Sequence, residues 1–124
     1  MALVSQVIAE ADVPNKNGRV YPAIILQKIA ADFAGQTVIG QVGMPQDSRI
    51  TLSETSHYIS NIRFDDHKLI GDVEIMDTPN GKILQGLADQ VVFRMAGVGV
   101  VHDGVIDENY KLVSINAVPI DEGA

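Results

Sequence analysis

The sequence predicts a single α/β domain, mainly β with two helices, that spans residues 1–124. Three observations lead to this fold class. The length is close to the commonest domain size and allows a core without disulfides or metal. Hydrophobic residues make up 46% of the chain but aromatic residues only 5%, so branched aliphatic side chains dominate, which favours sheet. Two segments carry apolar residues at helical spacing, whereas several others alternate apolar with polar residues.

The chain is expected to begin with a strand followed by a helix. Residues 3–11 are apolar and β-prone, and residues 13–18 contain the Asn and Gly that turns with positive φ require. Pro22 suits a first helical position, and Gly35 suits the position just past a helix end. Between them, residues 23–34 carry a helical stripe that consists of Ile25, Leu26, Ile29, Ala30 and Phe33.

The middle of the chain predicts a short strand, a long loop and a β-hairpin. Residues 37–39 are β-like, and Gly40 to Ser56 shows no period. Structureless loops of this length are uncommon in compact domains and are often functional. The hairpin turns at residues 65–68. Its apolar and polar positions alternate, which indicates one buried and one solvated face, with the first set at Tyr58, Ser60, Ile62 and Phe64 and the second at Leu69, Gly71, Val73 and Ile75.

The last third of the chain predicts a second helix and two strands. Thr78 suits the N-cap and Pro79 the first turn of this helix, whose apolar side is Ile83, Leu84, Leu87 and Ala88. Residues 91–101 are apolar on both faces apart from Arg94, which predicts a central strand. After a turn at residues 102–104, residues 110–118 form the closing strand.

Composition excludes several function classes. The net charge is −7 and the nine basic residues are scattered, which weighs against nucleic-acid binding. There is no Cys, so thiolate catalysis is excluded, and three dispersed His residues without a carboxylate cluster predict neither a metal nor a cofactor. His57 is expected to be structural. No membrane span or signal peptide is recognisable, which predicts synthesis in the host cytoplasm.

Several motifs resemble those of the prohead proteases of tailed bacteriophages, which trim scaffold and capsid proteins during head maturation. The most specific motif is Asn15-Lys16-Asn17-Gly18-Arg19-Val20-Tyr21-Pro22. Residues 77–84, Ser56-His57 and Gly97-Val98-Gly99 support it in the same order, so the resemblance spans nearly the whole chain. It implies one domain with a mixed or antiparallel β-barrel-like core flanked by helices, similar to the herpesvirus assembly proteases.

The resemblance also implies that the catalytic residues are lost. In that family a His-Pro pair carries the base, and a Ser-Ser-Arg-Gly-like strand carries the nucleophile. Here the corresponding residues are Met44-Pro45 and Arg94-Met95-Ala96-Gly97. A thioether cannot accept the proton of a hydroxyl, and a methyl group cannot attack a carbonyl. No Ser or Thr lies between Val91 and Val101, so shifting the register does not restore a nucleophile.

The resulting hypothesis is a non-enzymatic structural protein of a tailed-phage virion. A capsid decoration or minor head protein that binds the major capsid protein fits best. Self-association of the chain also remains open. The negative net charge favours a position on the outer surface of the capsid. Two alternatives remain: an active maturation protease with an atypical site, and a non-catalytic scaffold or assembly module inside the prohead. Arg is favoured at interfaces, and loops on rigid scaffolds often bind partners. The capsid-binding candidates are therefore Gln46, Asp47, Ser48, Arg49 and Arg94.

Overall fold

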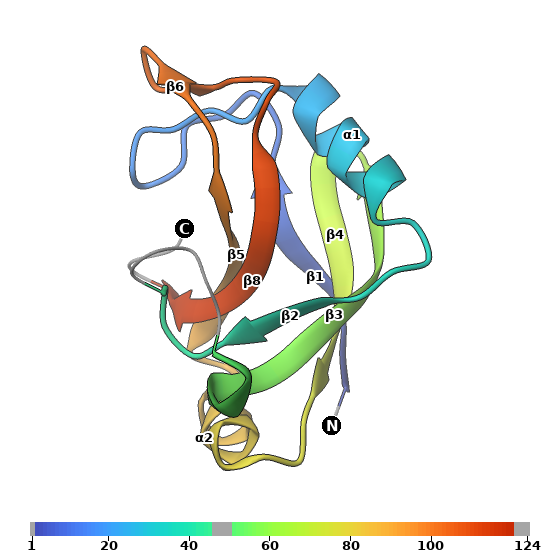
Figure 1. Ribbon diagram of the computed structural model, residues 1–124, viewed down its shortest axis with the longest axis vertical. Helices are drawn as coiled ribbons and strands as arrows, with labels where there is room; N and C mark the ends of the chain where they lie inside the picture. The colour runs from blue at the N-terminus through green and yellow to red at the C-terminus, as the bar shows by residue number, and fades with distance from the viewer. Residues whose placement is uncertain (1, 46–50, 121–124) are drawn as a thin grey trace.

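The computed structural model describes residues 2–45 and 51–120 (Figure 1). In chain order the elements are β1 (Ala2–Glu10), α1 (Ala23–Asp32), β2 (Val38–Gln41), the 3-10 turn η1 (Leu52–Glu54), β3 (Thr55–Asp65), β4 (Lys68–Ile75), α2 (Pro79–Leu87), β5 (Val91–Val98), β6 (Val101–His102), β7 (Val105–Ile106) and β8 (Lys111–Pro119). The expected class, mainly β with two helices, is confirmed.

Six strands surround one core in the manner of a barrel. A four-stranded antiparallel sheet has the order β1-β4-β3-β2, and β5 forms an antiparallel ladder with β8. The two sheets are joined where Val42 bridges Ala117 and the Gly43 N–H donates to the Ala117 carbonyl at 2.7 Å. On the opposite side β1 lies next to β5. The helices α1 and α2 lie outside the strands, near opposite ends of the molecule (Figure 1).

The position of β5 differs from the expected central strand. Within the described residues, β5 forms a backbone ladder with β8. Among these residues it forms none with β1, the strand on its other side. Its apolar character has another cause: Phe93 and Met95 are buried in the core. A strand at the joint of a barrel can therefore be as apolar as the middle strand of an open sheet.

The core combines one face of each main element. The α1 stripe buries Ile25, Leu26 and Ile29 as expected, but in α2 only Gly81 and Leu84 are buried, and Ile83 is 53% exposed. Each fully buried aliphatic side chain contributes about 1.5–3 kcal/mol. The largest apolar side chains that are completely removed from solvent are Ile8, Leu26, Ile59, Leu69, Val73, Leu84, Phe93 and Ile115.

The hairpin confirms one of the two predicted alternations and corrects the other. In β4 every second residue from Leu69 to Ile75 is buried, as expected. In β3 the register shifts between Ser60 and Arg63, with Asn61 at φ 52°. This β-bulge inserts an extra residue and reverses the phase of the strand. Ile59 and Ile62 are therefore both in the core, although they are three residues apart.

The loop expected over Gly40 to Ser56 is shorter at both ends. β2 continues through Gln41, β3 already begins at Thr55, and η1 occupies Leu52–Glu54. Backbone pairing of β2 with β3 and of Val42 with β8 accounts for the extension. Four of the candidate capsid-binding residues, namely Gln46, Asp47, Ser48 and Arg49, lie outside the described residues.

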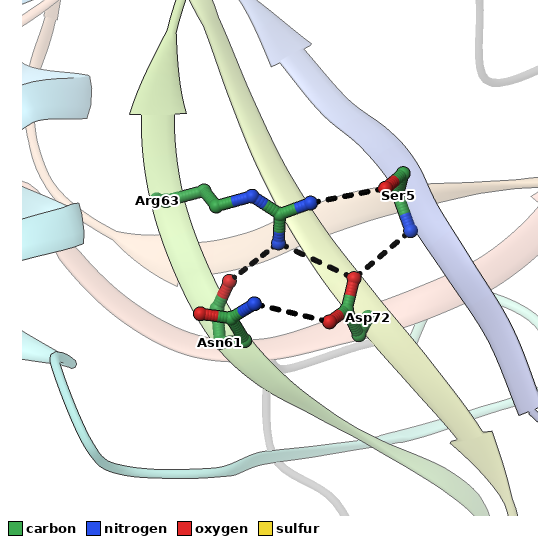
Figure 2. Close-up of polar contacts among 4 residues, drawn as sticks. All are labelled: Ser5, Asn61, Arg63 and Asp72. Carbon is green, nitrogen blue, oxygen red and sulfur yellow. Dashed lines mark hydrogen bonds and ion pairs between the residues drawn. The ribbon is translucent and has the colours of Figure 1, made fainter.

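A polar network holds two β-bulges on either side of β4 (Figure 2). Ser5 in β1 and Asn61 in β3 both have positive φ, and β4 between them carries Asp72. The Asp72 carboxylate accepts the Ser5 N–H at 2.9 Å, the Asn61 amide at 3.1 Å and Arg63 at 3.2 Å. The Ser5 N–H, with smaller contributions from Asn61 and Arg63, holds the pKa of Asp72 below its ordinary value. Because bulges bend and twist strands, this carboxylate stabilises the curvature of the sheet.

Asp72→Ala is expected to lower the free energy of unfolding, because the Ser5 N–H, the Asn61 amide and Arg63 then lose their shared acceptor. Urea denaturation followed by circular dichroism measures this loss. Asp89→Ala, at an exposed position after α2, removes the same charge and should cause no comparable loss. Equal stability of the two variants would show that the network does not support the bulges.

Candidate functional site

The site is a cleft where β1 and β5 approach each other. Its volume is about 430 Å³. One wall consists of residues 7–10 of β1 and the turn that follows, and the other of residues 94–97 of β5. Tyr21, Tyr110, Met44 and Val118 complete the lining. The turn holds its shape because Asn15 Oδ1 accepts the N–H groups of Asn17 and Arg19.

The cleft brings together Met44 and Ala96, the two positions that the resemblance assigns to base and nucleophile. Met44 is 47% exposed, whereas Ala96 is buried on β5 opposite Ser114 of β8. Met44 lies in the cleft because Val42 and Gly43, just after β2, pair with the backbone of Ala117 in β8. Two positions that are distant in sequence thus share one solvent-accessible hollow.

Beneath Met44 lies a buried polar pair that the sequence analysis missed. Asn116 and Ser114 of β8 are both completely buried. The Asn116 amide donates to Ser114 Oγ at 3.0 Å and to the Met44 sulfur at 3.6 Å, and its carbonyl oxygen accepts the Gln41 N–H at 3.0 Å. In catalytic triads a third group hydrogen-bonds to the base and orients it. Asn116 makes the corresponding hydrogen bond to Met44, the position that the resemblance assigns to the base. The signal in the sequence was two polar residues at alternate positions of an apolar strand.

Ser56 and His57 form a hydrogen-bonded pair, but away from the cleft. Ser56 Oγ lies 2.7 Å from His57 Nδ1, and His57 Nε2 lies 2.8 Å from the Ile115 carbonyl oxygen. Because a carbonyl can only accept, Nε2 carries the proton, and Nδ1 accepts from Ser56. Both side chains are completely buried, and burial lowers the pKa of His57 to about 4. The imidazole is neutral and inaccessible to a substrate, in keeping with the structural role expected of it.

Arg94 lies in the cleft and contacts both strands that border it. Its guanidinium donates to the Phe93 carbonyl at 2.8 Å and, across the joint, to the Val7 and Ile8 carbonyls at 3.3 Å and 3.5 Å. Burial lowers the pKa of Arg94, but a guanidinium stays protonated in proteins. Arg94 therefore places a positive charge in the wall of the cleft.

Two tyrosines close one end of the cleft. The Tyr21 and Tyr110 rings meet edge to face at 5.7 Å, and their hydroxyls hydrogen-bond. Burial raises the pKa of both tyrosines, so neither supplies a phenolate at neutral pH. A Cβ on Gly97 would lie 2.6 Å from the Tyr110 hydroxyl, and one on Gly99 2.9 Å from Tyr110 Cα. The close packing of Tyr110 explains Gly99, and the packing of Tyr110 together with the Lys111 carbonyl oxygen, 2.4 Å from such a Cβ, explains Gly97.

The described residues that line the cleft do not supply the Ser or Cys nucleophile and the His base of the serine and cysteine proteases. Among the described residues that line it there is no Ser, Thr, Cys or His. Over residues 2–45 and 51–120, no group of three His, Cys, Asp or Glu side chains could hold a metal ion. No helix in the same part of the chain is long and apolar enough to cross a membrane. What the cleft offers is shape, positive charge and apolar surface.

The barrel-like core with flanking helices is similar to the fold of the phage prohead proteases. The solved structure of the capsid assembly protease gp21 of bacteriophage T4 is similar to this chain with a TM-score of 0.81 and 20% sequence identity. The similarity covers 94% of this chain and 80% of that chain. At this identity the likeness establishes the fold. No protein-family model and no curated protein matches the sequence.

Proposed function

We propose that this chain is a non-enzymatic structural protein of a tailed-phage virion, a protease-like domain that binds the major capsid protein as a decoration or minor head protein. The observation that carries the proposal is the cleft itself: in a fold shared with a capsid assembly protease, its described lining lacks any Ser, Thr, Cys or His. Met44 and Ala96 lie in that lining, where a base and a nucleophile would be needed.

Loss of both groups leaves little of a serine-protease mechanism. Removing one member of a triad costs several orders of magnitude in rate, because nucleophile and base act as a unit. The buried Ser56–His57 pair does not replace them, since both side chains are at 0% exposure and His57 is hydrogen-bonded on both ring nitrogens. A stable fold without chemistry is suited to binding.

A position on the outside of the capsid is supported by charge. The chain carries a net charge of −7, which is unfavourable next to packaged DNA and favourable for solubility at an exposed surface. The candidate contacts remain Arg94 in the cleft wall and the segment that contains Arg49. They would meet complementary carboxylates of the major capsid protein, because Arg is enriched at such interfaces.

The test combines association with cleavage. We expect the purified protein to co-sediment with mature heads, to be present in purified virions in many copies, and to leave a capsid precursor uncut after prolonged incubation, as seen by mass spectrometry. It should also stay unlabelled by a fluorophosphonate probe. Labelling, or cleavage that disappears when one serine is mutated, would support the atypical protease instead. Presence in proheads and absence from virions would support the internal assembly module.

A further inference from the structure

The chain contains two Asn-Gly pairs, Asn17-Gly18 and Asn80-Gly81. Asparagine is thermolabile, because the backbone nitrogen of the next residue can attack its side-chain carbonyl carbon. Glycine in that next position favours the attack, since it has no Cβ to obstruct the approach and its backbone adopts many conformations. The two pairs therefore have a similar intrinsic reactivity, and the fold decides which of them reacts.

The first pair lies in the turn between β1 and α1, where both residues are exposed. A Cβ on Gly18 would have no heavy atom within 4 Å apart from its chain neighbours, so the Gly18 nitrogen has room to move. This N–H donates to the Asn15 carbonyl at 2.9 Å, and within the described residues no hydrogen bond holds the Asn17 side-chain amide. Breaking the exposed bond to Asn15 therefore frees the nitrogen for the attack.

The second pair lies in the first turn of α2 and is held on both sides. The Asn80 side-chain amide donates to the Glu54 carbonyl and to the Glu54 carboxylate, both at 3.0 Å. The N–H of the buried Gly81 donates to Thr78 Oγ1 at 3.0 Å, and a Cβ on Gly81 would lie 1.9 Å from the Met76 carbonyl oxygen. The same attack would here break these three hydrogen bonds and unwind the start of the helix.

We propose that Asn17 is a site of spontaneous deamidation and that the fold protects Asn80 from the same reaction. Hydroxide removes the Gly18 N–H proton, the nitrogen bonds to Cγ of Asn17, the Cγ–Nδ2 bond breaks, and the amide nitrogen takes up protons and leaves as ammonia. Water then opens the resulting succinimide ring. Opening at Cγ gives aspartate, whereas opening at the main-chain carbonyl carbon gives isoaspartate. The sum is asparagine plus water to a carboxylic acid plus ammonia, so no oxidant or partner is needed.

The modified turn is also the support of the β6–β7 hairpin. The Val20 N–H donates to the Gly104 carbonyl at 2.7 Å, and the Ile106 N–H donates to the Val20 carbonyl at 2.9 Å. Packing is close here, because a Cβ on Gly104 would lie 2.9 Å from the Gly18 carbonyl oxygen. Isoaspartate lengthens the main chain by one carbon atom just before Gly18. Conversion of Asn17 to isoaspartate should therefore loosen the hairpin, whereas aspartate adds only a charge.

Peptide mapping of the intact protein tests the site. After incubation at mildly alkaline pH and digestion with pepsin in acid, mass spectrometry should show the change from amide to acid at Asn17 at least about tenfold faster than at Asn80, since each hydrogen bond that must break slows the reaction. The rate should rise with hydroxide concentration. In concentrated urea, where the fold protects neither pair, the two rates should become similar. Equal rates in the folded protein, or reaction at Asn17 only in urea, would overturn the proposal.

Hydrogen exchange of the incubated protein tests the effect on the hairpin. The Ile106 amide should exchange faster in the isoaspartate form than in fresh protein. The Asn17→Asp variant carries the charge on a main chain of normal length and should exchange like fresh protein. The Asn17→Gln variant, whose longer side chain disfavours the ring, should keep its mass and its exchange rate through the incubation, whereas Asn80→Gln should still deamidate at Asn17. Unchanged exchange in the isoaspartate form would overturn the loosening of the hairpin.

Discussion

Gly40→Ala is expected to destabilise the protein by about 3 kcal/mol or more, an upper-range overpacking effect. A Cβ at this position would lie 1.8 Å from the Ile115 carbonyl oxygen and 2.4 Å from His57 Nε2. The first is a backbone atom of β8, and the second belongs to a fully buried ring, so neither can move aside cheaply. The methyl group would also separate β2 from β8, where the two sheets meet. Chemical denaturation measures the loss, which corresponds to roughly 10 °C in Tm.

Gly86→Ala provides the matched control. Gly86 lies in α2, and a Cβ there would have no heavy atom within 4 Å. Alanine favours the helix over glycine by about 0.8–1.0 kcal/mol, so this variant should be slightly more stable than the wild type. Opposite signs for the two glycine substitutions are expected. Similar stability of the Gly40→Ala protein and the wild type would mean that β2 and β8 are not packed as described.

Acid is expected to destabilise the fold through His57. Burial lowers the pKa of His57 from 6.5 to about 4, so between these values the unfolded chain binds a proton that the folded chain does not. The contribution of neutral His57 to the free energy of unfolding is therefore fully present above about pH 6.5. It falls as the pH is lowered and is lost at about pH 4. Its size is about 3 kcal/mol, from 1.36 kcal/mol for each unit of pKa difference.

Two measurements isolate this group from the carboxylates that also titrate in acid. In NMR titrations the His57 imidazole should remain neutral through pH 5, because burial penalises the charged form of the ring. In the His57→Gln variant, the slope of stability against pH between 4 and 6.5 should decrease, whatever its absolute stability. Titration of His57 near 6.5 would contradict a buried, neutral imidazole.

Local pattern was sufficient to predict the elements whose structure depends on nearby residues. The α1 stripe, the alternation in β4, the Thr78 cap on Gly81 at 3.0 Å and the Asp103-Gly104 turn all follow from short-range geometry. The bulge at Asn61 could not be predicted in this way, because its positive φ is stabilised by Asp72 on another strand. The place of β5 also depends on how the sheet closes, which no periodicity encodes.

The site was predictable only in part and for a similar reason. Resemblance pointed to Met44 and Ala96, and the structure brings both into one cleft. It gave no indication of Asn116, whose contact with Met44 arises from the pairing of β8 with the segment after β2. Nor did it indicate that Lys16, Arg19 and Arg94, which are scattered along the sequence, converge on the same hollow.

The contact of Arg94 with β1 has a consequence for the motions of the molecule. Within the described residues, the other joints between the six barrel strands contain backbone pairing, whereas β1 and β5 form no ladder and Arg94 donates across their joint to the Val7 and Ile8 carbonyls. Slow opening should begin where the fewest backbone bonds must break. β1 and β5 can therefore separate from each other while the backbone ladders between the other strands remain intact.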